Sequence, residues 1–274
     1  MNAIKEPVSI SHRGSSWTFI DVQEVKLDGV NYIFGRLSKY KPLGEVTVVD
    51  THKRTEETQI EPNLKVASSP FVYIPSHSGI AFLNVYNHIE QKAFVNRFCS
   101  IIKETYQRFF VDCDIELVSD LRSFAAKVSS LDGIYHVNAK ISPPNPMFGC
   151  LWAELKDYLI KRNTDRMTVV EDAPENQPLN TDLPYHIEKA ANQTVEEQYV
   201  SEEPLPIGDA AILMAADGYG HGTVRGKRDN EVVTIKTSET VKNFSFDKNP
   251  EPEELYLKAI GIFDEIKEKR HLGH

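Results

Sequence analysis

Three clusters of basic residues are the features of the sequence most able to bind a ligand. Lysine and arginine neutralise phosphate groups, and aromatic rings beside them pack on bases or sugars. If the clusters converge in space they form a phosphate-binding patch, and if they do not they are solvated charges in turns. The candidate nucleic-acid-binding residues are Arg36, Lys39, Tyr40, Lys41, Lys53, Arg54, Tyr219, Arg225, Lys227 and Arg228.

The overall charge limits what such a patch can be. With 31 Lys and Arg against 40 Asp and Glu, the 274-residue chain has a formal net charge of −9. This excludes a protein coated in positive potential that binds nucleic acid indiscriminately, but it leaves room for a local basic face. An acidic surface also suits a protein-interaction module that meets a basic partner.

A glycine-rich stretch at 217–222 precedes the third basic cluster. Glycine adopts backbone angles that other residues avoid, so the stretch predicts a hairpin turn. Glycine would also let the backbone approach a phosphate chain, helped by the basic residues just beyond it. Both interpretations stay open at the level of sequence. The stretch does not open a helix after a core strand, as a dinucleotide-binding fingerprint must.

Alternating carboxylates offer an enzymatic alternative. Asp112, Asp114 and Glu116 would share one face of a strand, and Lys140 follows on a later strand. A metal-dependent nuclease uses two or three carboxylates, commonly with a lysine, to hold Mg²⁺ and position water. Carboxylates at the polar edge of a strand are more often a solvated face. We therefore keep the nuclease as an alternative and assign no catalytic residues.

Other catalytic and cofactor motifs are missing from the sequence. It has no Gly-x-x-x-x-Gly-Lys-Ser/Thr phosphate loop, no Gly-x-Ser-x-Gly elbow and no His-x-x-x-His pair, and its nine histidines are scattered. The sequence thus predicts no metal ligands and no cofactor, and a protein that acts by binding.

Cysteines and hydropathy indicate the compartment. Cys99, Cys113 and Cys150 form no Cys-x-x-Cys pair, and their odd number leaves at least one outside any disulfide. We interpret them as reduced thiols in a cytoplasmic protein. No apolar run reaches the roughly 18 to 20 residues that span a bilayer, so we expect no membrane association.

The N-terminal part predicts antiparallel strands and helices. Asp28-Gly29 between two β-rich runs is a strong hairpin signal, and apolar residues at helical spacing predict a helix that buries an aromatic face. Ser119 or Asp120 would cap the next helix. The expected elements are a loose arm at 1–16, strands at 17–27, 30–39 and 45–49, a loop or edge at 52–62, a hairpin of 71–74 with 79–86, a helix at 94–109, a strand at 115–118 and a helix to 128.

The rest of the chain predicts a central strand-helix core and a C-terminal β meander closed by a helix. Alternation at 133–141 indicates a half-buried strand, with Tyr135, Val137, Ala139 and Ile141 on one side. A proline loop, a helix at 148–159 and a strand at 167–170 follow. The meander would consist of a strand at 210–216, the glycine turn and a strand at 232–237, and a helix follows Pro250 and Pro252.

Together these elements predict an α+β fold in three segments. The first is an α+β domain at 1–170, and the last is the meander with its helix at 207–274. Five prolines and few large apolar residues make 171–206 a linker or peripheral segment, with a helix at 183–199.

Three stretches of the sequence resemble a family of phage- and mobile-element-associated proteins. They are Tyr32-Ile-Phe-Gly-Arg-Leu-Ser-Lys-Tyr, Ser68-Ser-Pro-Phe-Val-Tyr-Ile-Pro and Val137-Asn-Ala-Lys-Ile-Ser. The order of elements over most of the chain is also similar to that of the RexA exclusion protein of phage lambda. This resemblance implies a cytoplasmic, dimeric DNA-binding sensor in abortive infection, without catalytic residues to transfer.

Three hypotheses about function follow. The first is a nucleic-acid-binding or sensing component of anti-phage defence that acts by binding. The second is a protein-interaction module of the same defence system, whose acidic surface meets a basic protein partner or mimics nucleic acid. A homodimer is a further expectation. The third is the nuclease that would use Asp112, Asp114 or Glu116.

Overall fold

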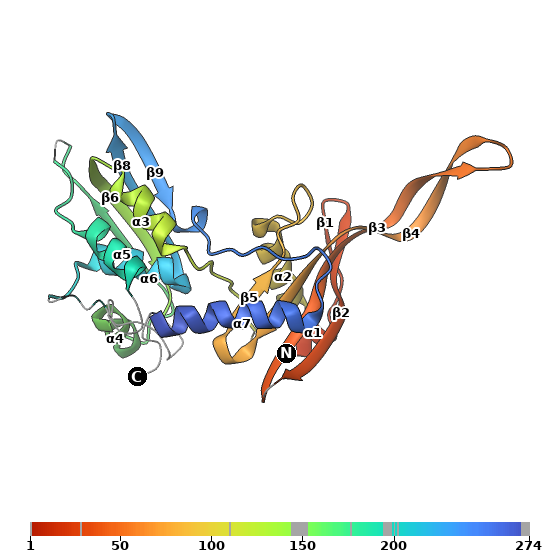
Figure 1. The fold of residues 1–274 in the computed structure, drawn as a ribbon, viewed down its shortest axis with the longest axis horizontal. Helices are drawn as coiled ribbons and strands as arrows, with labels where there is room; N and C mark the ends of the chain where they lie inside the picture. The colour runs from red at the N-terminus through yellow and green to blue at the C-terminus, as the bar shows by residue number, and fades with distance from the viewer. Residues whose placement is uncertain are drawn as a thin grey trace. The chain divides into compact units, whose positions relative to one another are not determined.

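The chain folds into two compact units with an α+β architecture, which confirms the predicted fold class (Figure 1). This computed structural model describes residues 2–27, 29–109, 111–143, 153–175, 177–193, 199, 201 and 203–269. Unit 1 comprises Met1–Ile115 with Ser245–Phe263, and unit 2 comprises Glu116–Phe244 with Asp264–His274. The division at 115/116 differs from the predicted one at 170, because β8, which follows residue 206, pairs with β6 and joins the C-terminal strands to the sheet of unit 2.

Unit 1 is built on a five-stranded antiparallel sheet in the order β1-β2-β3-β4-β5. Leu27 pairs with Val30 across the predicted hairpin, where Gly29 has a φ of +85°. This confirms the Asp-Gly hairpin, although Asp28 itself lies outside the described residues. The strands are β1 (Ile10–His12), β2 (Ser15–Leu27), β3 (Val30–Asp50), β4 (Thr55–Ile74) and β5 (Gly79–Phe82).

The expected loop or edge at 52–62 is for the most part a strand. Pairing of β3 with β4 continues from Leu43 opposite Pro62 to Asp50 opposite Thr55. We call residues 43–62 the β-arm, because this ribbon extends beyond the rest of its sheet (Figure 1). The loop alternative is wrong except for the turn at 51–54, whereas the edge alternative is confirmed, because residues 55–62 pair with β3 on one side only. The turn itself is stabilised by Asp50, whose carboxylate accepts hydrogen bonds from the amides of His52 and Lys53.

Helix α2 (Gln91–Thr105) confirms the predicted buried aromatic face. Phe94, Phe98 and Ile101 are buried, and the Phe94 ring stacks on Phe82 with a centroid distance of 3.9 Å. The helix ends four residues earlier than predicted, so Phe109 is exposed beyond it. The following residues 111–118 form neither a helix nor a paired strand, contrary to the prediction for 115–118.

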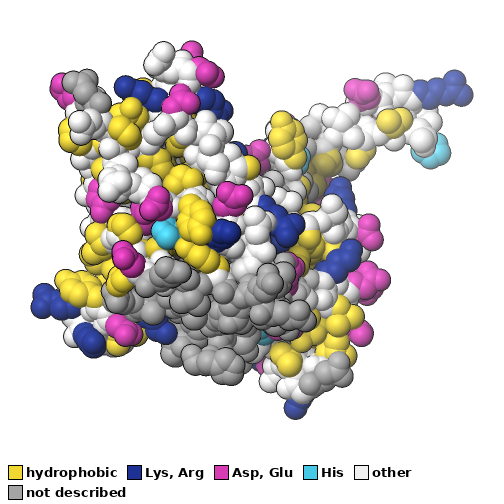
Figure 2. All heavy atoms as spheres, turned by 60° about the vertical axis from the view of Figure 1, so that its left-hand side comes forward, with side chains coloured by type: hydrophobic (Ala, Val, Ile, Leu, Met, Phe, Trp, Pro, Cys, Tyr) yellow, Lys and Arg dark blue, Asp and Glu magenta, His cyan; other side chains and the backbone are white. Residues whose placement is uncertain are grey.

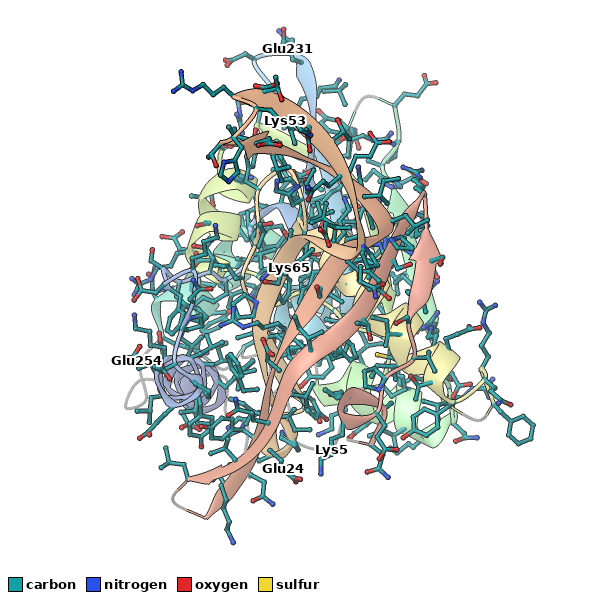
Figure 3. All side chains as sticks on the ribbon, turned by 90° about the vertical axis from the view of Figure 1, so that its right-hand side faces the viewer. Lys5, Glu24, Lys53, Lys65, Glu231 and Glu254 are labelled. Carbon is teal, nitrogen blue, oxygen red and sulfur yellow. The ribbon has the colours of Figure 1, made fainter. Side chains whose placement is uncertain are left out.

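Two helices complete the description of unit 1. The short α1 (Asn2–Lys5) replaces part of the expected loose arm, and Lys5 forms an ion pair with Glu24 of β2 (Figure 3). The predicted C-terminal helix is α7 (Pro252–Lys269). The ring of Tyr256 on this helix stacks on Tyr32 of β3 at a centroid distance of 4.1 Å. Both tyrosines are buried, so the start of α7 is part of the unit 1 core.

Unit 2 is built on a four-stranded antiparallel sheet in the order β7-β6-β8-β9. The Asp120 carboxylate accepts a hydrogen bond from the Ser123 amide, which confirms the predicted cap. Helices α3, α5 and α6 lie toward one side of this sheet (Figure 1). The elements are α3 (Leu121–Ser129), β6 (Gly133–Ile141), α4 (Ala153–Lys161), β7 (Met167–Asp172), α5 (Leu183–Asn192), α6 (Ile207–Met214), β8 (Gly220–Arg228) and β9 (Glu231–Lys236).

The central strand β6 follows the predicted alternation with one exception. Val137, Ala139 and Ile141 are buried, but Ile134 is buried in place of Tyr135. An irregularity in the pairing with β8 between Ile134 and His136 shifts the alternation by one residue. The proline loop and the first residues of the predicted helix at 148–159 lie outside the described residues.

The predicted strand at 210–216 is a helix. Every residue of α6 from Gly208 to Met214 is buried, and a π-helical turn, Ala215–Tyr219, continues it into β8. The glycine-rich stretch is therefore a helix-to-strand connection, not a hairpin turn. An uninterrupted apolar run fits a buried strand and a buried helix equally well, and Pro206 just before the run provides the helix start.

The segment 171–206 is not a linker. Leu183 and Ile187 of α5 are buried in the unit 2 core, and β7 extends to Asp172. The hydroxyl of Thr181 donates to the buried carboxyl of Asp209 on α6, at 2.6 Å from Oδ1 and 2.7 Å from Oδ2. Prolines and polar residues favoured a linker, but Leu179, Leu183, Ile187 and Leu205 pack in or against the core.

The described helices include none that is long and apolar enough to cross a membrane. This agrees with the absence of a long apolar run in the sequence.

The first testable prediction concerns Gly220, which has a φ of +155°. A Cβ at this position would overlap the backbone carbonyl oxygen of Lys140 on β6. We expect Gly220→Ala to lower the free energy of unfolding of unit 2 by about 3 kcal/mol or more, measured by urea denaturation. Gly261→Ala on α7 is the control, because a Cβ there meets nothing within 4 Å and should stabilise the helix by about 0.5 to 1 kcal/mol. A loss of less than 1 kcal/mol at Gly220 would contradict the clash.

The second prediction concerns Asp209, which is 1% exposed. Burial raises its pKa to about 6, and the nearby charges of Glu171 and Asp182 add to the rise. The folded state therefore holds the proton more tightly than the unfolded state does. Stability should fall by up to about 3 kcal/mol as pH rises from 4 to 6, and stay level above that. Asp209→Asn should abolish this fall in stability between pH 4 and 6. An identical pH profile in the variant would contradict the assignment to Asp209.

Candidate nucleic-acid interface

One face of the unit 2 sheet is exposed to solvent and rich in polar side chains. The opposite face buries Val137, Ala139, Val224 and Ile235 in the core shared with α6. Because side chains alternate along a strand, the intervening residues point away from α6. We call this surface the open face. It consists of Thr168, Val170 and Asp172 of β7, His136, Asn138 and Lys140 of β6, His221, Thr223, Arg225 and Lys227 of β8, and Val232, Thr234 and Lys236 of β9.

Strand register gathers the polar residues of the open face into rows. His136 lies opposite Arg225, and Arg225 lies opposite Thr234. In the next row Asn138 lies opposite Thr223, and Thr223 opposite Lys236. Lys140 pairs with His221 in the third row. Directly opposed residues have Cβ atoms roughly 5 Å apart, so each row is one continuous strip of donors.

Few acidic groups neutralise these cations. Within the part of the chain that the structure describes, Arg225 makes no ion pair, and Lys227 lies over the ring of Tyr135 at 4.7 Å from its centroid. His136 Nδ1 is 2.7 Å from the Asp172 carboxylate at one edge of the sheet. At the other edge, Lys236 Nζ is 3.8 Å from Glu239. The middle of the open face therefore keeps its positive charge.

A carboxylate borders the open face at the Lys140 end. Glu116 Oε1 lies 3.8 Å from His221 Nδ1. Burial raises the pKa of Glu116, while the neighbouring His221 and Lys140 oppose the rise. Glu116 thus faces two groups that favour its ionised form.

The structure brings together only part of the predicted basic residues. Arg225 and Lys227 lie on the open face. Arg228 points elsewhere, at the end of the β8–β9 hairpin, where its Nε donates to the carbonyl of Ser130 at 3.2 Å. The Tyr219 side chain packs against the unit 2 core, so its ring is not presented to a ligand.

The predicted residues of β3 belong to unit 1, and most interact with neighbouring side chains. Arg36 lies 3.5 Å from the Asp21 carboxylate and over the Phe34 ring. The amine of Lys39 lies over the Trp17 ring, 5.5 Å from its centroid. Tyr40 donates a hydrogen bond to the Ser9 hydroxyl at 3.0 Å. Lys41 is exposed near the base of the β-arm.

Lys53 and Arg54 lie at the end of the β-arm, where Figure 2 shows basic side chains. Lys53 Nζ is 2.7 Å from Glu57 and 3.5 Å from Asp50. Its charge is therefore balanced by carboxylates of the same ribbon, whereas Arg225 has no such partner among the described residues. Lys65, labelled in Figure 3, lies on β4 beyond the β-arm.

Several residues of the open face were not among the predicted binding residues. His136, Asn138 and Lys140 do alternate in the sequence of β6, and Thr223 alternates with Arg225 on β8. That alternation was the available signal. The alternation does not show that β6 pairs with β8, because the two strands are far apart in the sequence and only the tertiary structure brings them together.

The nuclease hypothesis loses its geometric basis. Asp112, Asp114 and Glu116 do not lie on a paired strand. Asp112 forms an ion pair with Lys103 at 2.5 Å, whereas Glu116 belongs to unit 2 and faces His221. The described residues include no group of three or more His, Cys, Asp or Glu able to hold a metal ion.

The fold and the open face define an α+β protein with a basic sheet surface on an acidic chain. The chain belongs to the DUF4747 family, a domain of unknown function whose model matches residues 1–198. The match ends before α6, so β8 and β9, which contribute Arg225 and Lys227, follow it. Comparison with curated proteins and with solved structures gave no match.

Proposed function

We propose that this protein binds nucleic acid through the open face of unit 2, and that it acts by binding rather than by chemistry. The observation that supports the proposal is the row-by-row gathering of Lys140, Arg225, Lys227 and Lys236 on one exposed sheet face. A protein with a net charge of −9 concentrates four cations there, with only edge carboxylates against them.

The spacing of the cations suits a phosphate chain. Arg225 and Lys227 are two residues apart on β8, which separates their Cα atoms by about 6.8 Å. Thr223, Thr234 and Asn138 add neutral groups that can donate to phosphate oxygens. Apart from the imidazoles of His136 and His221, the residues of the open face include no aromatic ring, and Lys227 covers the ring of the nearby Tyr135. We therefore expect contacts to the backbone of the nucleic acid, with little sequence preference.

The biological setting is part of the proposal. From the resemblance to phage-associated proteins and to RexA, we infer that such binding serves anti-phage defence of the abortive-infection type, in the cytoplasm. A basic face on an acidic protein fits a sensor, because it limits indiscriminate binding while keeping one surface for nucleic acid.

A salt titration of purified protein against labelled duplex and single-stranded DNA tests the proposal. Replacing Arg225 and Lys227 together by Gln removes two phosphate contacts. We expect weaker binding and a slope of log K against log salt that is shallower by about 2 on duplex DNA and by about 1.4 on single strands.

The matched control is the double variant Lys53→Gln and Arg54→Gln, which removes the same charge from the β-arm. It should leave affinity and slope close to those of the unaltered protein. An equal loss of DNA affinity in both double variants, or no DNA binding at low salt, would contradict the open face as the binding surface. Cleavage of DNA on addition of magnesium would contradict a function by binding alone.

A second candidate function, protein binding, is favoured by the β-arm. Leu43, Val49 and Ile60 are 73%, 68% and 66% exposed, and the register places them on one face of the ribbon. Glu45 and Glu56 lie on the same face. Such a surface fits a partner that is both apolar and basic. The open face of a second copy offers both, with Lys227 opposite Val232, which is 67% exposed.

This candidate predicts self-association that is sensitive to both surfaces. Sedimentation velocity over a concentration series should show a dimer that weakens in Leu43→Ser with Ile60→Ser and also in Arg225→Gln with Lys227→Gln. Thr47→Ser, on the same face of the arm, is the control and should not change it. A monomer at all concentrations would exclude this partner for the arm.

A further inference from the structure

Two cysteines of unit 1 lie within contact distance of each other. Cys99 is on α2, and Cys113 is in the segment without regular secondary structure that follows the helix. Their sulfur atoms are 3.4 Å apart, and both side chains are half-buried. A disulfide needs a separation of about 2.05 Å, so the sulfurs must approach by about 1.4 Å. A short unpaired segment such as 111–115 can supply a movement of that size.

The surroundings of the pair make its two thiols unequal. The hydrogen bond to Cys99 lowers the pKa of the Cys113 thiol, and the Lys103 ammonium lowers it further, against opposing effects of burial and of Asp112. The pKa of Cys99 is raised, first by its hydrogen bond to Cys113 and then by burial. Cys113 is thus the more acidic thiol of the pair, and Cys99 is the less acidic one.

We propose that Cys99 and Cys113 are a peroxide-sensitive dithiol that closes reversibly into a disulfide. The Cys113 thiolate attacks one oxygen of hydrogen peroxide, the O–O bond breaks, and the departing hydroxide takes up a proton to become water. Cys113 is then a sulfenic acid. The Cys99 sulfur attacks the Cys113 sulfur, the S–O bond breaks, and a second water leaves with the Cys99 proton. Two thiols lose two electrons in all, and peroxide gains them.

The two cysteines are less suited to binding a metal ion than to forming a disulfide. Two thiols alone do not complete a zinc site, which takes four ligands. The described residues include no third His, Cys, Asp or Glu grouped with the pair as a ligand set. Reversible oxidation also suits a protein of a reducing compartment, where disulfides are typically transient and redox-sensing.

The disulfide would tether residues 111–115 to α2. This segment leads directly into Glu116, where unit 2 begins. It follows a turn in which Gln107 and Arg108 have φ values of +52° and +57°. Closing the loop from Cys99 to Cys113 restricts how far this turn can open, because it shortens the free chain between two fixed points.

Mass spectrometry of the full chain before and after treatment with dilute hydrogen peroxide tests the proposal. We expect the loss of two hydrogens, about 2 Da, in the intact mass, a cross-linked peptide joining Cys99 to Cys113, and full reversal by dithiothreitol. The Cys150→Ser variant removes the third thiol and should behave identically. A cross-link through Cys150, a link between chains, or two unreacted thiols would overturn the proposal.

Single-cysteine variants test the assigned roles. In Cys99→Ser, oxidation should stop at a sulfenic acid on Cys113 that dimedone traps. In Cys113→Ser, Cys99 should give no dimedone adduct at the same peroxide concentration. The reverse pattern would show that Cys99 is the reacting thiol and overturn the assignment. Since either variant can affect folding, the experiment on the unaltered chain stands by itself.

Discussion

The close packing of α6 against β8 is the contact on which unit 2 depends. Seven consecutive residues of α6 are buried, which is possible only if elements surround the helix on all sides. Gly222 faces this helix, and a Cβ on it would lie 2.9 Å from the Ile212 side chain. Gly222, part of the stretch that predicted a turn or a phosphate cradle, therefore lets a helix approach the sheet. Alternation along β8 then sends Arg225 and Lys227 to the other face.

Hydrogen bonds between buried polar groups connect α6 to a segment that is distant from it in the sequence. Asp209 of α6 accepts from Thr181, and the Gly208 amide donates to the Glu171 carboxylate of β7 at 3.1 Å. Each contact satisfies a group that would be costly to bury alone. They connect α6 to both ends of the stretch 171–181. That is why a segment poor in apolar residues belongs to the core instead of linking two domains.

The basic side chains of the two units have different surroundings. In unit 1, Arg36 and Lys53 have carboxylates nearby, and Lys39 lies over an aromatic ring. On the open face of unit 2, Arg225 lies among threonine, histidine and asparagine. A basic side chain without an ion pair costs little free energy in water. It attracts a phosphate more strongly than a basic side chain that a carboxylate already neutralises. The contrast favours unit 2 as the nucleic-acid surface.

The sequence by itself determined the local features: the Asp-Gly hairpin, the aromatic face of α2, the Asp120 cap, the alternation of β6 and the final helix. These depend on neighbours within a few residues, where periodicity and turn chemistry suffice. Tertiary structure alone decided that 210–216 is a helix, that α5 joins the core, and that β6 pairs with β8. A buried apolar run carries no polar alternation to mark its type, and strand pairing depends on residues far apart in the chain. The open face arises from that pairing. The sequence predicted β6 and β9 singly, but it predicted neither β8 between them nor the pairing that joins the three strands.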